Sequence, residues 1–249
     1  MTLEITVEDR DGVRHVVLDR PDKKNALTSA MYATLADAVG SASGDGIGAV
    51  LLRSSSGTFT AGNDLRDFLD RPPHGDDAPV TRFLHSLAET DVPIVAAVRG
   101  AAVGIGTTML LHCDLVYAAP NALLKLPFID LGLVPEAASS VLLPRRIGRA
   151  RSGAALYLGE AIDAAGALQS GLITEIVPDE RLDARAAGAA ETIAAKPREA
   201  VRETKRLLNY DRAAILEAMD RESRAFSVRL GSNEARAAMA SFFSSRAAR

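Results

Sequence analysis

Two short strand-like segments, residues 49–53 and 94–98, most constrain the fold of this chain. Neither alternates polar with apolar residues, and each is followed by a stretch rich in glycine and other small residues. A strand that is apolar on both sides belongs in a sheet covered on both faces, which is typical of parallel sheets with crossover helices. The sequence therefore predicts an α/β fold around a buried parallel sheet.

Neighbouring segments fit the same alternation of strands and helices. Residues 3–8 and 13–18 are expected to form a hairpin about Asp11 and Gly12, followed by a helix that starts at Thr28 or Ser29. A helix is expected near residues 79–90. A second helix is expected to begin at the glycine-rich bend of residues 100–106 and to end near residue 112, and a strand is expected over residues 115–118.

The chain changes character after about residue 138, where alanine and charged residues dominate. This pattern predicts successive helices, near 139–147, 150–158, 180–195, 197–209, 211–230 and 233–249. We therefore divide the chain into an α/β core, residues 1–195, and a C-terminal helical region, residues 196–249. Such helices pack either on their own core or on a neighbouring subunit, so the region is predicted to serve oligomerisation.

Composition argues against several classes of protein. Lysine and arginine number 29 against 32 acidic residues, for a formal net charge of −3, so the basic excess of a nucleic-acid binder is missing. Cys113 is the only cysteine, and the four histidines lack metal-ligand spacing. No apolar segment is long enough to span a membrane, and the first residues do not resemble a secretory signal. We expect a cytoplasmic protein with no metal, nucleic-acid or membrane partner.

Two glycine-bearing segments, residues 57–65 and 98–108, each follow a buried strand and precede a helix. Backbone N–H groups at a helix start lack intrahelical acceptors and favour negative charge. If two of them converge on one point they form an oxyanion hole. Taken singly, each segment is better interpreted as an ordinary tight turn.

Six blocks in order along the chain carry a resemblance to a known family: Arg20, Pro21, Asn25, Ala26 and Leu27; Phe59 to Leu65; Ala97 to Gly106; Cys113 to Ala118; Leu131 to Glu136; and Gly171 to Val177. Together they resemble the crotonase (enoyl-CoA hydratase/isomerase) superfamily, and in motifs most of all the peroxisomal-type Δ3,Δ2-enoyl-CoA isomerases. The resemblance implies a crotonase-like (ClpP/crotonase) spiral of ββα units and a homotrimer or dimer of trimers. It also implies an acyl-CoA thioester substrate, with coenzyme A as part of the substrate and no separate cofactor.

The resemblance also implies a set of site residues. The oxyanion hole would consist of the backbone N–H groups of Asn63 and Ile105. The implied contacts with coenzyme A and substrate are Lys23, Lys24, Ala26, Ala61, Gly62, Asn63, Asp64, Leu65, Gly104 and Phe128.

The carboxylates bear on which reaction is possible. Hydratases of the family use two glutamates to activate water, and the corresponding positions here are Thr108 and Phe128. Glu136 is the remaining candidate, although an acidic residue near a helix start is also common for electrostatic reasons alone. One base and an oxyanion hole suffice to move a proton between two carbons. The sequence favours an enoyl-CoA isomerase with Glu136 as acid and base; the alternatives are an enoyl-CoA hydratase and a catalytically silent acyl-CoA-binding homologue.

Three further expectations concern residues around this site. Asp64 is expected to fix its own turn through side-chain-to-backbone hydrogen bonds, and Asp114 to be structural. Ala137 and Ala138 stand where relatives often have two glycines, so the turn after Glu136 is expected to differ. Residues 72–77, rich in proline and glycine, are expected to form a mobile loop.

Overall fold

The computed structural model describes residues 4–70, 75, 77–209 and 211–247. Its centre is a six-stranded sheet, whose strands lie in the order β1 (Ile5–Arg10), β2 (Val13–Leu18), β3 (Ala49–Ser54), β4 (Ile94–Val98), β6 (Leu115–Ala118) and β9 (Glu175–Ile176). Only β1 runs antiparallel to its neighbour, as one arm of the predicted hairpin. All other pairs are parallel, which confirms the predicted sheet.

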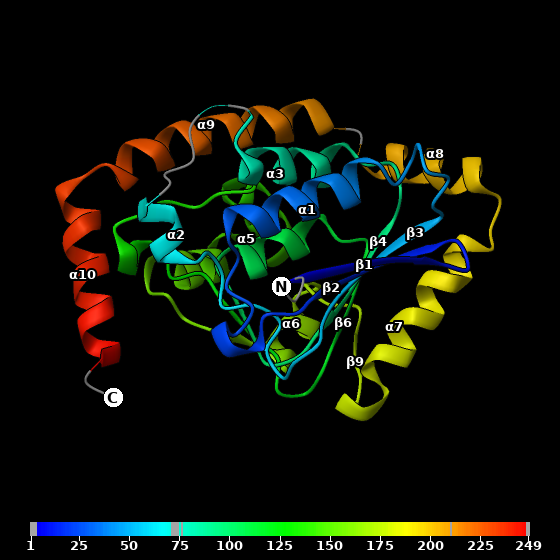
Figure 1. Ribbon diagram of the computed structural model, residues 1–249, viewed down its shortest axis with the longest axis horizontal. Coiled ribbons are helices and arrows are strands. Elements are labelled where there is room, and N and C mark those ends of the chain that lie inside the picture. Colours follow the sequence, from blue (N-terminus) through cyan, green and yellow to red (C-terminus); the bar gives the residue numbers. More distant parts are fainter. Residues whose placement is uncertain (1–3, 71–74, 76, 210, 248–249) are drawn as a thin grey trace.

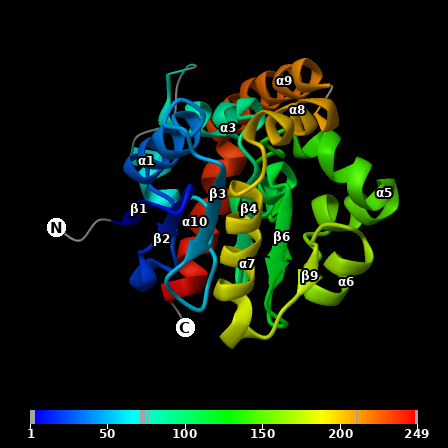
Figure 2. The same ribbon diagram turned by 90° about the vertical axis from the view of Figure 1, so that its right-hand side faces the viewer.

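The two faces of this sheet pack against different helices (Figure 2). In β3, Val50 and Leu52 belong to the main core with α1 (Ser29–Gly40), whereas Leu51 belongs to a second cluster with α7 (Asp179–Ala194). Successive residues of a strand point to opposite faces. Burial on both faces therefore explains why β3 and β4 are continuous apolar runs.

A smaller sheet lies beside the first and contains three strands, β5 (Ala101–Val103), β7 (Leu123–Lys125) and β8 (Ile162–Asp163). The chain passes from β4 to β5 and later from β6 to β7, so each pass places one strand in each sheet. The sequence did not predict β5, which was expected to be part of a bend. A strand of three small residues has no periodic signal and depends on its partner β7, about twenty residues further along the chain.

Helices on the main-core side follow the predictions closely. α1 begins at the predicted place, with the side chain of Thr28 accepting a hydrogen bond from the N–H of Met31, and α3 (Pro79–Glu89) packs along it. The short helices are η1 (Pro21–Lys23), α2 (Leu65–Asp70), α4 (Ile105–Thr108), η2 (Met109–His112) and η3 (Ile129–Leu131). Most of the loop predicted over residues 72–77 lies outside the described residues.

The C-terminal half is helical, as predicted, and contains α5 (Ser139–Tyr157), α8 (Arg198–Leu208), α9 (Arg212–Leu230) and α10 (Asn233–Ala247). It also contains α6 (Ala164–Gln169), which was not predicted. Gly148 has non-helical backbone angles and divides α5 where two helices were predicted. α9 lies along α3 (Figure 1) and also contacts α5. α10 contacts η3.

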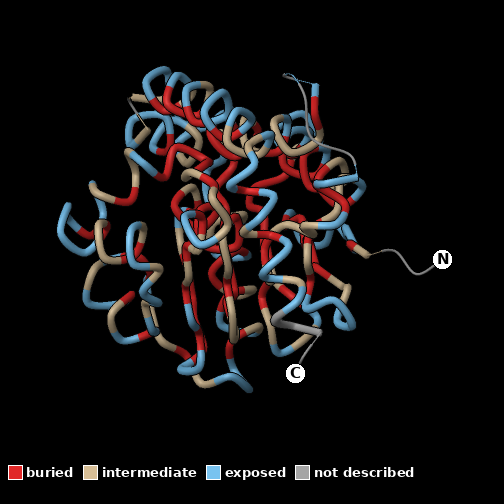
Figure 3. The backbone as a smooth tube through the Cα atoms, turned by 90° about the vertical axis from the view of Figure 1, so that its left-hand side faces the viewer, coloured by how far each residue is buried: buried red, intermediate tan, exposed pale blue. Residues whose placement is uncertain are grey.

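Both final helices contribute to the main core of the same chain, through Phe226, Ala235 and Met239. Figure 3 shows buried residues along the strands and the inner sides of the helices around them. Because its helices contribute these residues to the core of the same chain, the helical region packs on its own core. Its predicted role in oligomerisation stays a prediction.

In the described part of the chain, no helix is both long and apolar enough to cross a membrane.

Candidate active site

The two glycine-bearing segments lie against each other. Thr60 donates its N–H to the carbonyl of Ala101 at 3.1 Å and accepts from the N–H of Val103 at 3.0 Å. A Cβ added at Gly62 would lie 2.7 Å from the carbonyl oxygen of Val103, and one at Gly106 would lie 2.5 Å from the Thr60 methyl group. The glycines therefore allow two backbones to approach more closely than side chains would permit.

Asn63 and Ile105, the two predicted oxyanion donors, follow glycines with positive φ. The φ angles are 86° at Gly62 and 55° at Gly104. In the part of the chain that the structure describes, neither the Asn63 nor the Ile105 N–H has a hydrogen-bond acceptor. The Ile105 side chain is fully buried in the core, and its N–H begins α4, where helical geometry provides no acceptor.

The segment predicted to hold coenzyme A pairs with the first oxyanion segment. The N–H of Ala61 donates to the carbonyl of Lys24 at 2.9 Å, and the N–H of Leu27 donates to the carbonyl of Gly62 at 2.8 Å. Ala26 lies between these two contacts, and the Lys23 and Lys24 side chains are exposed. The structure therefore brings the predicted coenzyme A contacts next to the predicted oxyanion donor.

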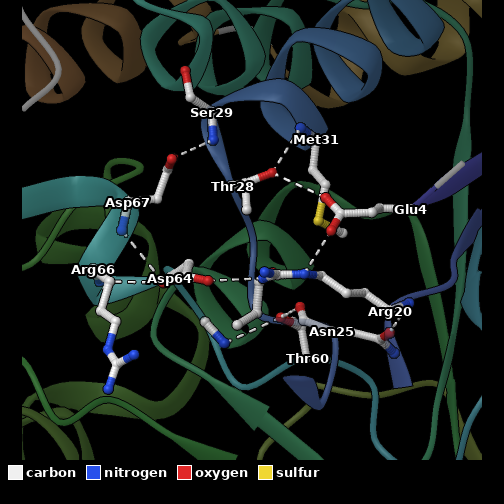
Figure 4. Close-up of polar contacts among 12 residues, drawn as sticks. Glu4, Arg20, Asn25, Thr28, Ser29, Met31, Thr60, Asp64, Arg66 and Asp67 are labelled. Atoms are coloured by element: carbon white, nitrogen blue, oxygen red, sulfur yellow. Dashed lines mark hydrogen bonds and ion pairs between the residues drawn. The ribbon is translucent and has the colours of Figure 1, made fainter. Parts of the chain in front are cut away.

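Asn25 holds this junction together from inside the protein. Its side chain is fully buried; it accepts from the Arg20 N–H at 2.8 Å and donates to the carbonyls of Thr58 and Phe59 at 2.9 and 3.1 Å. The Thr60 hydroxyl donates to the Asn25 carbonyl at 2.6 Å (Figure 4). A buried amide with these partners fixes the course of both segments.

Asp64 has the structural role expected from the sequence. Its Oδ1 accepts from the N–H groups of Arg66 and Asp67 at the start of α2, and its Oδ2 pairs with Arg20 at 2.8 Å (Figure 4). Partial burial opposes ionisation, but these donors hold the pKa of Asp64 below its usual value. Asp114 is structural too, because its Oδ2 accepts from the Ile94 N–H at 2.7 Å.

Glu136 is a buried acid next to the oxyanion segment. It lies three residues before α5, and its side chain does not cap that helix. Instead, Oε1 accepts a hydrogen bond from the Thr108 hydroxyl of α4 at 2.6 Å. Burial raises the pKa of Glu136 to about 8, the Thr108 hydrogen bond acts in the opposite direction, and the charge of Glu222 raises it further. Such a carboxyl takes up and releases protons near neutral pH.

The turn that carries Glu136 has a glycine-like backbone although it contains no glycine. Ala137 and Ala138 have φ angles of 59° and 55°, so the alanines adopt the left-handed conformation that glycines would adopt. The carbonyl of Ala137 accepts from Nε2–H of His112 at 2.8 Å. Burial lowers the pKa of His112 to about 4, so this imidazole is neutral near pH 7.

Tyr32 contacts the predicted oxyanion segment, which the sequence did not indicate. Its hydroxyl is buried and donates to Oδ1 of Asn63. Burial, and then the charge of Glu136, raise the pKa of Tyr32 well above its usual value. Tyr32 lies on the buried face of α1, and its ring packs against Phe68 and Phe83. In the sequence it cannot be distinguished from an ordinary core residue.

Other sequence candidates lie around this centre. The side chain of Phe128, at the second hydratase position, is buried and apolar. Gly104 donates its N–H to the carbonyl of Lys125 at 2.8 Å, and the Leu65 side chain is half-buried at the start of α2. Among the described residues, no group of three histidine, cysteine or acidic side chains is placed to hold a metal ion.

Known proteins similar to this chain carry the names of enoyl-CoA isomerases and enoyl-CoA hydratases. Residues 8–248 match the family model described as enoyl-CoA hydratase/isomerase. The chain is 32% identical to human enoyl-CoA delta isomerase 2 over 228 residues, covering 89% of this chain but only 57% of that protein. It is also 32% identical to the probable enoyl-CoA hydratase echA8 of Mycobacterium leprae, over 98% of this chain and 96% of that one.

Its structure is similar to the crystal structure of an enoyl-CoA hydratase/isomerase from Pseudoalteromonas atlantica T6c. The TM-score is 0.94 at 40% identity, with 98% of both chains covered. This likeness confirms the predicted crotonase-like fold.

Proposed function

The chain belongs to the enoyl-CoA hydratase/isomerase family, and from this premise we propose that it is an enoyl-CoA isomerase. It would shift the double bond of a 3-enoyl-CoA to the 2-position through a thioester enolate. One observation carries the proposal: the buried Glu136 carboxyl accepts a hydrogen bond from Thr108. Thr108 occupies a position where hydratases of the family have a catalytic glutamate.

The proposed reaction needs one base and one oxyanion site. Glu136 removes a proton from C2, and the electron pair of that bond moves into the thioester carbonyl to form a dienolate. The N–H groups of Asn63 and Ile105 stabilise the developing oxyanion, at about 3 kcal/mol for a well-placed donor. The proton then returns from Glu136 to C4, which leaves the double bond between C2 and C3 and regenerates the carboxylate.

The environment of Glu136 suits this role. A pKa of about 8 gives a carboxylate that is more basic than usual and still partly ionised near neutral pH. The Thr108 hydroxyl holds Oε1, which orients the carboxyl and leaves Oε2 to carry the proton. Phe128 supplies no acid or base, so no second group of that kind is available at that position to activate water.

A hydratase is the second candidate, because the Mycobacterium leprae relative bears that name and matches nearly the whole of both chains. The two candidates differ in their need for activated water. Hydration requires a base placed to take a proton from water, whereas isomerisation transfers the substrate's own proton.

Purified protein should be assayed separately on 3-hexenoyl-CoA and 2-hexenoyl-CoA, beside Glu136→Gln and the control Asp130→Asn. Asp130 is an exposed carboxylate close in sequence. We expect conversion of the 3-enoyl substrate, lost in Glu136→Gln and kept in Asp130→Asn. Hydration of the 2-enoyl substrate that survives Glu136→Gln would refute the assignment, and binding of both substrates without turnover would identify a silent homologue.

We also propose that the substrate is an acyl-CoA and that the protein assembles as a homotrimer or a dimer of trimers. Tyr157 and Leu158, at the end of α5, are large apolar residues left about 70% exposed, which is the kind of surface that subunit contacts cover. Light scattering after size-exclusion chromatography tests the assembly.

Lys23 and Lys24 are proposed to contact the phosphate groups of coenzyme A. A raised KM for acyl-CoA in Lys23→Ala and in Lys24→Ala tests this proposal.

A further inference from the structure

One carboxylate interrupts the apolar face of α9. The buried residues of this helix recur at intervals of three and four, as expected for one face, and they are Ile215, Ala218, Met219, Glu222 and Phe226. Glu222 is the only ionisable residue among them, and 8% of its surface is exposed. Glutamate is rarely buried unless it has a partner, so its place in this stripe needs an explanation.

Glu222 reaches the start of the helix that follows the Glu136 turn. Its Oε1 accepts a hydrogen bond from the N–H of Ser140 at 2.9 Å, across 82 positions of sequence. Its Oε2 is buried and has no hydrogen-bond partner in the described part of the chain. The contact therefore joins α9 of the C-terminal region to the first turn of α5.

The turn next to this contact is one that needs support. Ala137 and Ala138 both lie in the left-handed region, where side chains other than glycine are disfavoured and persist only if their surroundings hold them. His112 holds the carbonyl of Ala137, and the Ser139 hydroxyl donates to the carbonyl of Glu136 at 2.6 Å. These contacts come from η2 and from within the turn, whereas Glu222 approaches from α9.

We propose that Glu222 is a positioning residue for Glu136. By holding the N–H of Ser140, it keeps the left-handed Ala137–Ala138 turn in the conformation that directs the Glu136 carboxyl toward Thr108 and the oxyanion segment. The inference rests on the proposed role of Glu136 as acid and base. It assigns to the C-terminal region a direct part in the geometry of the site.

The same helix also contacts the other side of the site. Phe226, one turn beyond Glu222, packs edge-on against Phe68 of α2, with ring centroids 6.5 Å apart. α2 begins two residues after Asn63, and Phe68 in turn packs against Tyr32. One face of α9 therefore lies behind both the oxyanion turn and the Glu136 turn.

Glu222 also acts on Glu136 through its charge. Burial is the main cause of the raised pKa of Glu136, and the charge of Glu222 adds to it. Burial raises the pKa of Glu222 itself, whereas the hydrogen bonds from Ser140 and Ala138 and the charge of Arg221 act in the opposite direction. Other ionisable side chains of α9 and of the elements around it pair with one another, in the contacts His85 with Asp220, Arg145 with Asp211, Arg212 with Asp91, and Arg229 with Glu234.

The test compares Glu222→Gln and Glu222→Leu with the wild-type protein, in steady-state turnover of 3-hexenoyl-CoA between about pH 6 and pH 9.5. Leucine fits the apolar stripe but cannot accept from Ser140, so we expect kcat to fall by about tenfold to a hundredfold with KM little changed. Glutamine keeps the acceptor and loses the charge. It should retain kcat at high pH, and the rising limb of its pH profile should move to lower pH.

Glu217→Leu is the matched control, because Glu217 lies on the exposed side of the same helix. An unchanged kcat in Glu222→Leu, or an unshifted limb in Glu222→Gln, would overturn the inference. Should Glu222→Leu fail to fold, the limb of the isosteric Glu222→Gln decides. Glu136→Gln is run in the same assay: if it stays active the proposed function fails, whereas its inactivity beside a fully active Glu222→Leu refutes only the role of Glu222.

Discussion

Replacing Glu136 with glutamine should make the protein more stable while abolishing its activity. The pKa of Glu136 is raised from 4.5 to about 8 in the folded protein, chiefly by burial. Above pH 4.5 the unfolded chain releases this proton and the folded protein keeps it, so the folded state loses stability as the pH rises from 4.5 to about 8. Glutamine has the same size, stays neutral, and still offers an oxygen to the Thr108 hydroxyl.

The magnitude follows from the size of the shift. Each pKa unit corresponds to about 1.4 kcal/mol, so the difference between folded and unfolded states has an upper limit of roughly 5 kcal/mol at pH 8 and above. For a chain of this length, 1 kcal/mol moves the melting temperature by about 2–4 °C. We therefore expect Glu136→Gln to melt about 10 °C higher than the wild-type protein at pH 8.5. At pH 5 the gain should fall to roughly 1 kcal/mol or less.

Thermal melting followed by circular dichroism at pH 5, 6, 7 and 8.5 measures this difference, at one fixed protein concentration so that assembly does not alter the result. Glu180→Gln, at an exposed position of α7, is the control and should show no such trend. A Glu136→Gln protein whose melting temperature exceeds that of the wild type equally at pH 5 and pH 8.5 would refute the reasoning. A less stable variant at pH 8.5 would do the same.

Three further substitutions test other parts of the structure. Gly62→Ala places a Cβ 2.7 Å from a carbonyl oxygen of β5. We expect kcat/KM to fall at least about a hundredfold, while circular dichroism shows a folded protein. Near-normal activity would contradict the close approach of the Gly62 backbone to β5. Tyr32→Phe removes the donor to Asn63 and should lower kcat about tenfold with KM unchanged, whereas a change in KM alone would contradict a role in placing the oxyanion turn. Lys205→Met removes a buried ammonium group that pairs at 2.8 Å with the partly exposed Asp114. It should lower the free energy of unfolding by on the order of 2 kcal/mol in urea titrations, and an unchanged midpoint would show that the pair is not needed.

The strands of the central sheet could be predicted because their signal is local. Residues 94–98 form a strand over the predicted range, since five apolar residues between Pro93 and Arg99 fit a strand buried on both faces. The start of α1 could be predicted for a similar reason, because Thr28 provides a cap within one turn. Such features depend on neighbours within a few residues, and these are visible in the sequence.

Features that depend on distant partners could not be predicted in this way. β5 contains three small residues and exists through its pairing with β7. The left-handed turn at Ala137 and Ala138 contradicts the preference of alanine, and is held by His112 and Glu222 from elsewhere in the chain. An apolar helical stripe interrupted by a glutamate was a visible signal for Glu222, but nothing in the sequence indicated what it contacts.

The sequence by itself determined which chemical groups are available. Glycines precede Asn63 and Ile105, and Glu136 is present. The two positions where hydratases of the family have glutamates are occupied by Thr108 and Phe128. The tertiary structure decided what Glu136 is: a carboxyl enclosed by α4, α5 and α9, with a pKa near 8. The physical reason is that ionisation depends on exclusion of water and on nearby charges. Both arise from segments that are far apart in the sequence and meet only when the chain folds.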